Sequence, residues 1–159
     1  MRFSYHMILA IFFFCSTLCC INISLAHQEF LDVHNQARKE VGVRPLTWNT
    51  TLEAYAQNYA NSRIDDCAME HSMGPYGENL AEGHGEMKDA DAVKFWLTEK
   101  PFYDYDSNKC VQDECLHYTQ IVWRDTVHLG CGKANCKNGW VFVICSYSPV
   151  GNIDGQRPY

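Results

Sequence analysis

Six cysteines within residues 27–159 constrain the fold of this chain more than any other feature. The chain has 159 residues and nine cysteines, of which three lie at positions 15, 19 and 20 in an apolar N-terminal stretch. The other six are Cys67, Cys110, Cys115, Cys131, Cys136 and Cys145. An even number in a small secreted domain is typical of a disulfide framework, and no pair has the Cys-x-x-Cys spacing of a zinc site. We therefore expect three disulfides, although six cysteines allow 15 pairings and spacing alone does not choose one.

Residues 1–26 have the features of a signal peptide. Arg2 is the only formally charged residue there, residues 7–23 are mostly apolar, and Ser24-Leu25-Ala26 is a small-x-small cleavage site. A retained membrane anchor is the alternative, but polar residues interrupt the apolar run, which is short for a span. We expect cleavage after Ala26 and a secreted single domain over residues 27–159.

The charge of the chain restricts the classes of partner that it can bind. The formal net charge is −6 at pH 7, and lysine and arginine form no cluster. An acidic domain of this kind argues against nucleic acid as a partner and against electrostatic docking on anionic lipid.

Helical periodicity occurs in three segments. Apolar residues recur at helical spacing over 30–41 and 50–64, and again over 89–99, where Pro101 stops the pattern. Thr50 and Glu53 have the spacing of a capping box at the start of the second helix. The same position carries the sequon Asn49-Thr50-Thr51, which makes Asn49 a candidate for N-glycosylation.

Three segments are predicted to be strands. These are residues 79–81, 130–134 and 140–147, and Asn138-Gly139 is a hairpin turn signal between the last two. The last strand has apolar side chains on both faces, so it should be central and covered on two sides. The expected fold is α+β, a three-layer α-β-α sandwich, followed by a tail over 149–159 without periodicity.

Four titratable residues, two histidines and two glutamates, stand out as candidates for a functional site, and one of each has an ordinary structural interpretation. His117 begins a short apolar segment, where a short helix would place it at the N-terminal end. On that segment alone it is interpreted as a structural histidine. Glu99 lies near the buried stripe of its helix, where a carboxylate usually forms a salt bridge or a cap. His71 and Glu78 occur in a glycine-rich loop.

Four motifs then point to a family. They are His34-Asn35-x-x-Arg38, Gly77-Glu78-Asn79-Leu80, His117-Tyr118-Thr119-Gln120-x-x-Trp123 and Val143-Ile144-Cys145-Ser146-Tyr147-x-Pro149-x-Gly151-Asn152. In this order the chain resembles the CAP superfamily, which comprises cysteine-rich secretory proteins, antigen 5 and pathogenesis-related class 1 proteins. The six-cysteine layout and the ending Pro158-Tyr159 resemble the plant pathogenesis-related class 1 branch. The resemblance spans residues 27–159.

The resemblance carries expectations about the site and the disulfides. It implies the same α-β-α sandwich, with a cavity that holds His71, Glu78, Glu99 and His117. It also implies the pairs Cys67–Cys136, Cys110–Cys115 and Cys131–Cys145. The sequence departs from the family in two places: Leu116 stands where glycine is common, which would narrow the approach to the cavity, and Ser146 stands where asparagine is frequent.

The chemistry of the four cavity residues is left open by the sequence. Two imidazoles and two carboxylates suit a divalent metal such as zinc, and they equally suit a hydrogen-bonded structural cluster that requires no cofactor. A hydrolase, the alternative function, needs a nucleophile. Ser72 follows His71, but adjacency in sequence does not give the geometry of a triad.

Lipid binding is the function that the resemblance favours. Family members bind sterols and inhibit fungi or oomycetes, and Phe102, Tyr103 and Tyr105 are the candidates for contact with sterol. These aromatics would otherwise plug the edge of the core.

The resemblance also implies release of a signalling peptide over 149–159. The resulting hypothesis is a monomeric plant defence protein of the apoplast or vacuole that binds a sterol or another lipid of pathogen membranes rather than turning over a substrate.

Overall fold

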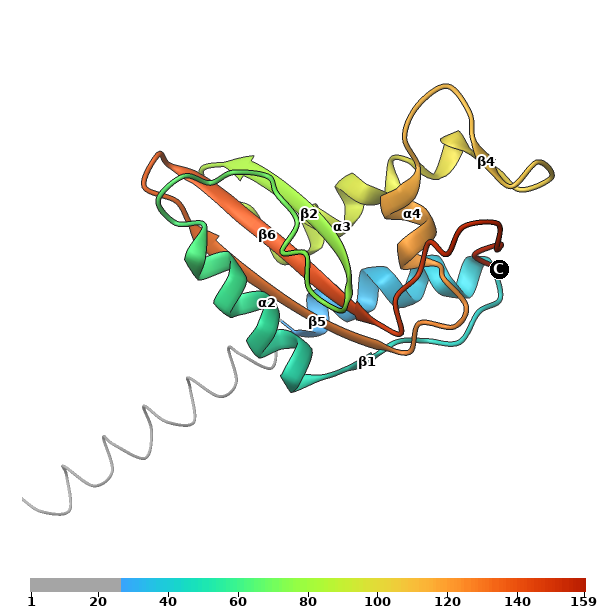
Figure 1. Ribbon diagram of the computed structural model, residues 1–159, viewed down its shortest axis with the longest axis horizontal. Coiled ribbons are helices and arrows are strands. Elements are labelled where there is room, and N and C mark those ends of the chain that lie inside the picture. The colour runs from blue at the N-terminus through green and yellow to red at the C-terminus, as the bar shows by residue number, and fades with distance from the viewer. Residues whose placement is uncertain (1–26) are drawn as a thin grey trace, which may run out of the picture.

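The computed structural model describes residues 27–159. The expected signal peptide, residues 1–26, and its cleavage site after Ala26 lie outside the described residues. The centre of the molecule is a four-stranded sheet in the order β1-β5-β6-β2 (Figure 1). The strands are β1 (Thr47–Trp48), β2 (Gly77–His84), β5 (His128–Asn135) and β6 (Trp140–Ser148). β1 pairs with β5 in parallel, and the other two pairings are antiparallel.

The strand β6 is central, as its sequence predicted. Val143 and Cys145 face one apolar cluster, and Phe142 and Ile144 face the other, so both faces of the strand are buried. The hairpin between β5 and β6 turns at Gly139, whose φ of +85° lies in the left-handed region that glycine adopts without strain.

One face of the sheet is covered by α2 (Thr50–Ser62), which packs closely on β5 (Figure 1). Gly130 and Gly132 permit this approach, because a Cβ at either position would overlap the backbone of α2. The start of α2 differs from the expected capping box. Asn49 is the N-cap, and its Oδ1 accepts from the backbone N–H groups of Thr51 at 2.9 Å and Leu52 at 3.1 Å. The prediction was wrong because the helix begins one residue earlier, so that Thr50 lies inside it and the backbone N–H of Glu53 donates to Asn49 O at 3.0 Å.

Glu53, the other half of the expected capping box, has different partners. Its carboxylate contacts His27 Nε2 at 2.7 Å and accepts from Trp48 Nε1 at 2.9 Å. These contacts tie α2 to the helix of residues 27–40, which we call the His34 helix, and to β1.

The other face of the sheet is covered by the His34 helix, α3 (Asp89–Leu97) and α4 (Leu116–Ile121). Phe30, Trp96 and Ile121 from these helices pack against Leu129 and Val143 of the sheet. α3 ends before the expected boundary at Glu99, which instead precedes the short 3-10 helix η1 (Lys100–Phe102). The proline at position 101 explains this, since it cannot continue an α-helix.

The sheet and its two helical layers form the predicted α-β-α sandwich, and three disulfides join its parts. Cys131 and Cys145 are paired residues of β5 and β6. Cys67–Cys136 fastens the segment after α2 to the end of β5. Cys110–Cys115 links a small ribbon, β3 (Tyr103–Asp104) and β4 (Lys109–Cys110), to the start of α4. These are the pairs that the family resemblance implies. Over residues 27–159, no helix is long and apolar enough to cross a membrane.

Candidate functional site

His117 lies in the first turn of α4 and is fixed by Glu99. Its Nδ1 contacts Glu99 Oε1 at 2.5 Å. Glu99 Oε2 accepts from the backbone N–H groups of His117 at 2.9 Å and Tyr118 at 3.1 Å. The ring of Trp96 stacks on the imidazole, with centroids 6.2 Å apart. Since α4 has no side-chain cap of its own, the carboxylate supplies partners for its first N–H groups.

His71 is paired with Glu78 in a second, separate arrangement. Glu78 belongs to β2, and its side chain is only 5% exposed. Its Oε2 contacts His71 Nδ1 at 3.2 Å and accepts from the backbone N–H of Ser72 at 2.9 Å. The Ser72 hydroxyl also donates to Glu78 and contacts the hydroxyl of Tyr55 at 2.6 Å. The loop that holds His71 is therefore ordered around one buried carboxylate.

The two histidines meet at one cavity of about 240 Å³. His71, Glu78 and His117 line it, whereas Glu99 lies behind His117 and off the wall. The other lining residues come from β2, from α4 and the residue two positions before it, and from the tail after β6: Gly77, Asn79, Glu114, Leu116, Gln120, Val150, Gly151 and Asn152. Within residues 27–159, no three His, Cys, Asp or Glu side chains lie close enough together to hold a metal ion. The predicted group of four is thus two carboxylate–imidazole pairs.

A buried chain of hydrogen bonds connects this cavity to the core. His34 Nε2 contacts the Tyr147 hydroxyl at 2.8 Å, and its Nδ1 contacts Phe30 O at 2.8 Å. Asn79 donates from Nδ2 to the Tyr147 hydroxyl at 3.1 Å and to His117 O at 3.0 Å. Burial lowers the pKa of His34 to about 4, so the ring is neutral near pH 7.

Arg38 organises the segment that follows α4. Its guanidinium is fully buried and donates only to backbone carbonyls. The acceptors are Ile121 O and Trp123 O at 2.8 Å, Thr126 O at 2.9 Å and Arg44 O at 2.7 Å. Burial lowers the pKa of Arg38 to about 10. Because this value is still well above 7, the guanidinium is charged at neutral pH.

Comparison with known proteins identifies this architecture. Residues 31–147 match the family described as "CAP: Cysteine-rich secretory protein family". The chain belongs to the CAP family. The basic form of pathogenesis-related protein 1 from Nicotiana tabacum is 58% identical over 132 residues, covering 83% of this chain and 75% of the relative. Pathogenesis-related leaf protein 6 from Solanum lycopersicum is 51% identical over 154 residues, covering 96% and 92%. The CAP domain is therefore of the plant pathogenesis-related protein 1 branch.

A solved structure agrees with the assignment of the fold. The crystal structure of NaASP2 with Zn²⁺ has a TM-score of 0.65 and 26% sequence identity, and the match covers 84% of each chain. None of these three names designates an enzyme.

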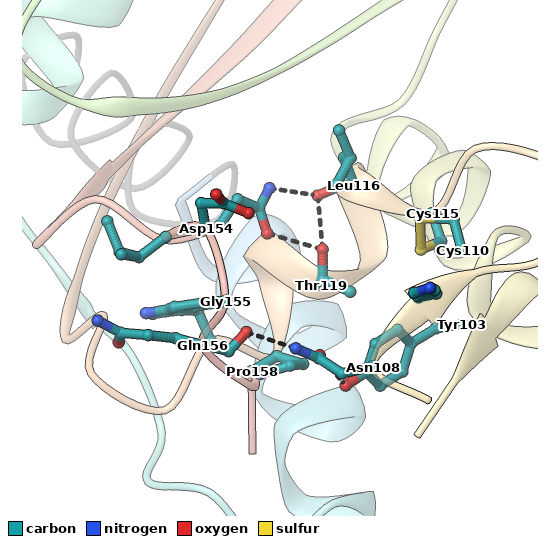
Figure 2. A pocket seen from close by; sticks show the side chains of 14 residues that line it. Tyr103, Asn108, Cys110, Cys115, Leu116, Thr119, Asp154, Gly155, Gln156 and Pro158 are labelled. Carbon is teal, nitrogen blue, oxygen red and sulfur yellow. Dashed lines mark hydrogen bonds between the residues drawn. A yellow bond between two sulfur atoms is a disulfide. The ribbon is translucent and has the colours of Figure 1, made fainter. Parts of the chain in front are cut away.

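The aromatic loop of this CAP domain gathers two of its three candidate residues, Tyr103 and Tyr105, around Tyr159 and leaves Phe102 apart. Tyr103 lines a second cavity, of about 180 Å³, together with residues of the tail (Figure 2). Tyr105 stacks on Tyr159 with centroids 5.2 Å apart, and the guanidinium of Arg157 lies 4.9 Å from its ring centroid. Phe102, half-buried in η1, lines neither cavity.

A third hollow of the CAP domain was not predicted from the sequence. It lies between the His34 helix and α3, has a volume of about 530 Å³, and is lined by Val33, Ala37 and Leu97 with longer polar and charged side chains around them. Lys100 Nζ and Glu40 Oε2 form an ion pair of 2.8 Å beside it. The helical periodicity of residues 30–41 and 89–99 predicted both helices, but a single sequence does not reveal that two such helices leave a groove between them. We call this hollow the helix groove.

Proposed function

We propose that this protein is a secreted plant defence protein that binds a sterol or another lipid of fungal or oomycete membranes, in the apoplast or vacuole. The names of its relatives support the defence role, and its disulfides suit an oxidising compartment. The observation that carries lipid binding is the helix groove, which is the largest of the hollows described above and has Val33, Ala37 and Leu97 on its wall.

The energetics favour the helix groove over the aromatic loop. Burying ~300 Å² of apolar lipid surface at ~25 cal/mol/Å² yields roughly 7 kcal/mol before ordering costs, so micromolar or weaker affinity is expected. A lipid can be buried in this way only where apolar side chains line an open groove. In the loop, Tyr103 and Tyr105 already pack against Tyr159, and the cavity beside Tyr103 is smaller.

Lipid binding by matched variants tests the proposal. We expect Val33→Lys with Leu97→Lys to weaken binding of ergosterol or palmitate by at least about tenfold, because charge replaces apolar wall. Phe95→Lys is the matched control, since Phe95 is 58% exposed on the same helix and lines no part of the groove. The triple alanine variant of Phe102, Tyr103 and Tyr105 tests the loop. Loss of binding in that variant alone would move the site to the loop, and unchanged binding in both would overturn the proposal.

Zinc binding is a second candidate, favoured by the pairing of each cavity histidine with a carboxylate. A carboxylate at Nδ1 fixes the ring and leaves Nε2 for a metal, as in many zinc sites. His71 and His117 would hold the ion, with fewer protein ligands than the three of catalytic zinc sites. Bound zinc would supply a Lewis acid. In calorimetry with zinc chloride, His117→Ala should lower affinity by at least about tenfold, and equal affinity in the variant would overturn this assignment.

The contacts of Ser72 favour lipid binding over hydrolysis of a substrate. The Ser72 hydroxyl is bonded to Glu78, to Tyr55 and to the backbone N–H of Gly74, and no histidine ring is among its partners in the part of the chain that the structure describes. In a Ser-His hydrolase a histidine takes the proton of the serine, and Ser72 has no histidine among these partners.

Release of residues 149–159 as a signalling peptide is part of the same proposal. Pro149 and Val150 are exposed, so a protease can reach the chain where this peptide begins. The tail is also fastened to the body, since Gly151 N donates to Gln120 Oε1 at 3.0 Å and Arg124 N donates to Pro158 O at 2.7 Å. Mass spectrometry of apoplastic fluid during infection should detect the peptide, and its absence there would count against release.

A further inference from the structure

The three disulfides of this domain differ in exposure. Cys131 and Cys145, which are 5% and 0% exposed, lie in the core between the sheet and the His34 helix, and Cys67 and Cys136, at 5% and 6%, lie under α2. Cys110 is exposed, and so is every residue from Val111 to Glu114, while its partner Cys115 is 1% exposed. An attacking thiolate therefore has direct access to one sulfur of this bond, and to the other two bonds only if the core opens.

The Cys110–Cys115 disulfide also borders open space. Both cysteines line the 180 Å³ cavity, and Figure 2 shows the sulfur–sulfur bond on the same side as Tyr103. Thiol–disulfide exchange requires the incoming thiol to reach the bond, and a cavity beside the bond provides the room.

Opening this bond affects the histidine cavity, because the bond lies at the start of α4. Cys115 is the residue before α4, and its neighbours Glu114 and Leu116 line the cavity of His71 and His117. The start of α4 is held by the disulfide, by the carboxylate of Glu99, and by hydrogen bonds to Leu116 O and His117 O. The disulfide is the one covalent link among these contacts, and opening it leaves the hydrogen bonds and the core intact.

We propose that Cys110–Cys115 is a thiol–disulfide exchange site, which a dithiol reductant opens while the other two disulfides stay closed. One thiolate of the reductant attacks Sγ of Cys110, the bond to Cys115 breaks, and Cys115 leaves as a thiolate that takes up a proton. The second thiol of the reductant, as its thiolate, attacks the mixed disulfide and expels Cys110, which is protonated in turn. The reductant leaves as a disulfide, so two electrons and two protons pass to the protein.

The contacts that remain after reduction determine which residues gain freedom. The ribbon keeps its own hydrogen bond from Val111 N to Phe102 O at 2.7 Å, and Asn108 Nδ2 still donates to Gln156 O at 3.1 Å. Residues 110–115 are no longer closed into a ring by the disulfide and stay joined to the ribbon by the backbone alone, so the rim of the histidine cavity at Glu114 gains freedom. The exchange site thus sets how firmly one side of the cavity is held.

Alkylation during reduction tests the exchange site in the full-length secreted protein. With dithiothreitol as the reductant and mass spectrometry as the readout, Cys110 and Cys115 should become alkylated on the order of 100-fold faster than the other four cysteines, because these react only after local or global opening. Simultaneous labelling of all six cysteines, or earlier labelling of Cys131 and Cys145, would overturn the proposal.

Trypsin cleavage after Lys109 tests the consequence. Lys109 is exposed in β4, next to the disulfide, and reduction should speed cleavage there by about tenfold because the ribbon loses an anchor. The variant with both Cys110→Ser and Cys115→Ser should be cleaved at the fast rate with or without dithiothreitol. Equal cleavage of oxidised and selectively reduced wild type would show that the disulfide does not anchor the ribbon. This comparison uses wild type alone, so it does not depend on the variant being able to fold.

Discussion

Glu99 holds His117 by both of its carboxylate oxygens: Oε1 contacts the imidazole Nδ1 at 2.5 Å, and Oε2 accepts from the backbone N–H at 2.9 Å. The carboxylate comes from the segment after α3, and the histidine begins α4. One side chain therefore orients the ring and completes the start of a six-residue helix at the same time. The histidine can keep its direction into the cavity because its own backbone is held by the same group.

Glu99→Ala should destabilise the protein by about 2–3 kcal/mol, because it leaves charge-assisted hydrogen bonds unmade at a partly buried helix start. Glu99→Gln should cost less, since its amide oxygen can still accept from the backbone N–H of His117. Urea denaturation followed by tryptophan fluorescence measures both. A loss below about 0.5 kcal/mol for Glu99→Ala would contradict the role of a cap.

Acid should weaken the fold through His34. Its pKa is lowered from 6.5 to about 4 in the folded protein, so below pH 6.5 the unfolded chain takes up a proton that the folded chain does not. Stability is fully present above pH 6.5, falls as the pH drops to 4, and loses about 3 kcal/mol over this window.

Urea melts between pH 7 and pH 4 on wild type and on His34→Gln measure this effect. The glutamine variant should be less stable at pH 7 and should lack this component of the pH dependence. Because the carboxylates titrate in both proteins, the difference between the two curves isolates His34. Parallel curves would show that His34 is not the responsible group.

Arg38→Lys should be nearly as damaging as removal of the side chain, with a loss of about 3 kcal/mol. The planar guanidinium reaches carbonyls of two separate segments, Arg44 O before β1 and Thr126 O after α4, and an ammonium group cannot span them. Thermal unfolding of Arg38→Lys against a surface control, Lys39→Arg, measures the difference. Equal melting temperatures would mean that the carbonyls find other donors.

The sequence predicted the fold better than the site, for a physical reason. The central position of β6 follows from apolar residues on both faces of one strand, and that pattern is local. By contrast, Asn79 reaches the Tyr147 hydroxyl across 68 residues and His117 O across 38, and no local pattern encodes such contacts. All three residues occur in the motifs that identify the family, which was the one available signal. The helix groove left no signal, because its wall residues have the same spacing as buried ones.

Asn49 joins two roles that separate variants can distinguish. Its Oδ1 caps α2, and the same residue heads the sequon Asn49-Thr50-Thr51. Asn49→Ala should remove both the cap and the glycan, and the loss of the cap should cost about 1 kcal/mol. Asn49→Ser should keep a cap, because serine is also a good N-cap residue, while removing the glycan.

Thr51→Ala completes the test, because only the backbone N–H of Thr51 takes part in the cap. This variant should lose the glycan and keep the stability of the unglycosylated wild type. Glycosidase treatment of the secreted proteins, read as gel mobility, reports the glycan, and urea denaturation of the treated proteins reports the cap. If the mobility of wild type does not change on treatment, Asn49 is unmodified. If Asn49→Ala is then as stable as Asn49→Ser, the side chain does not act as the cap either.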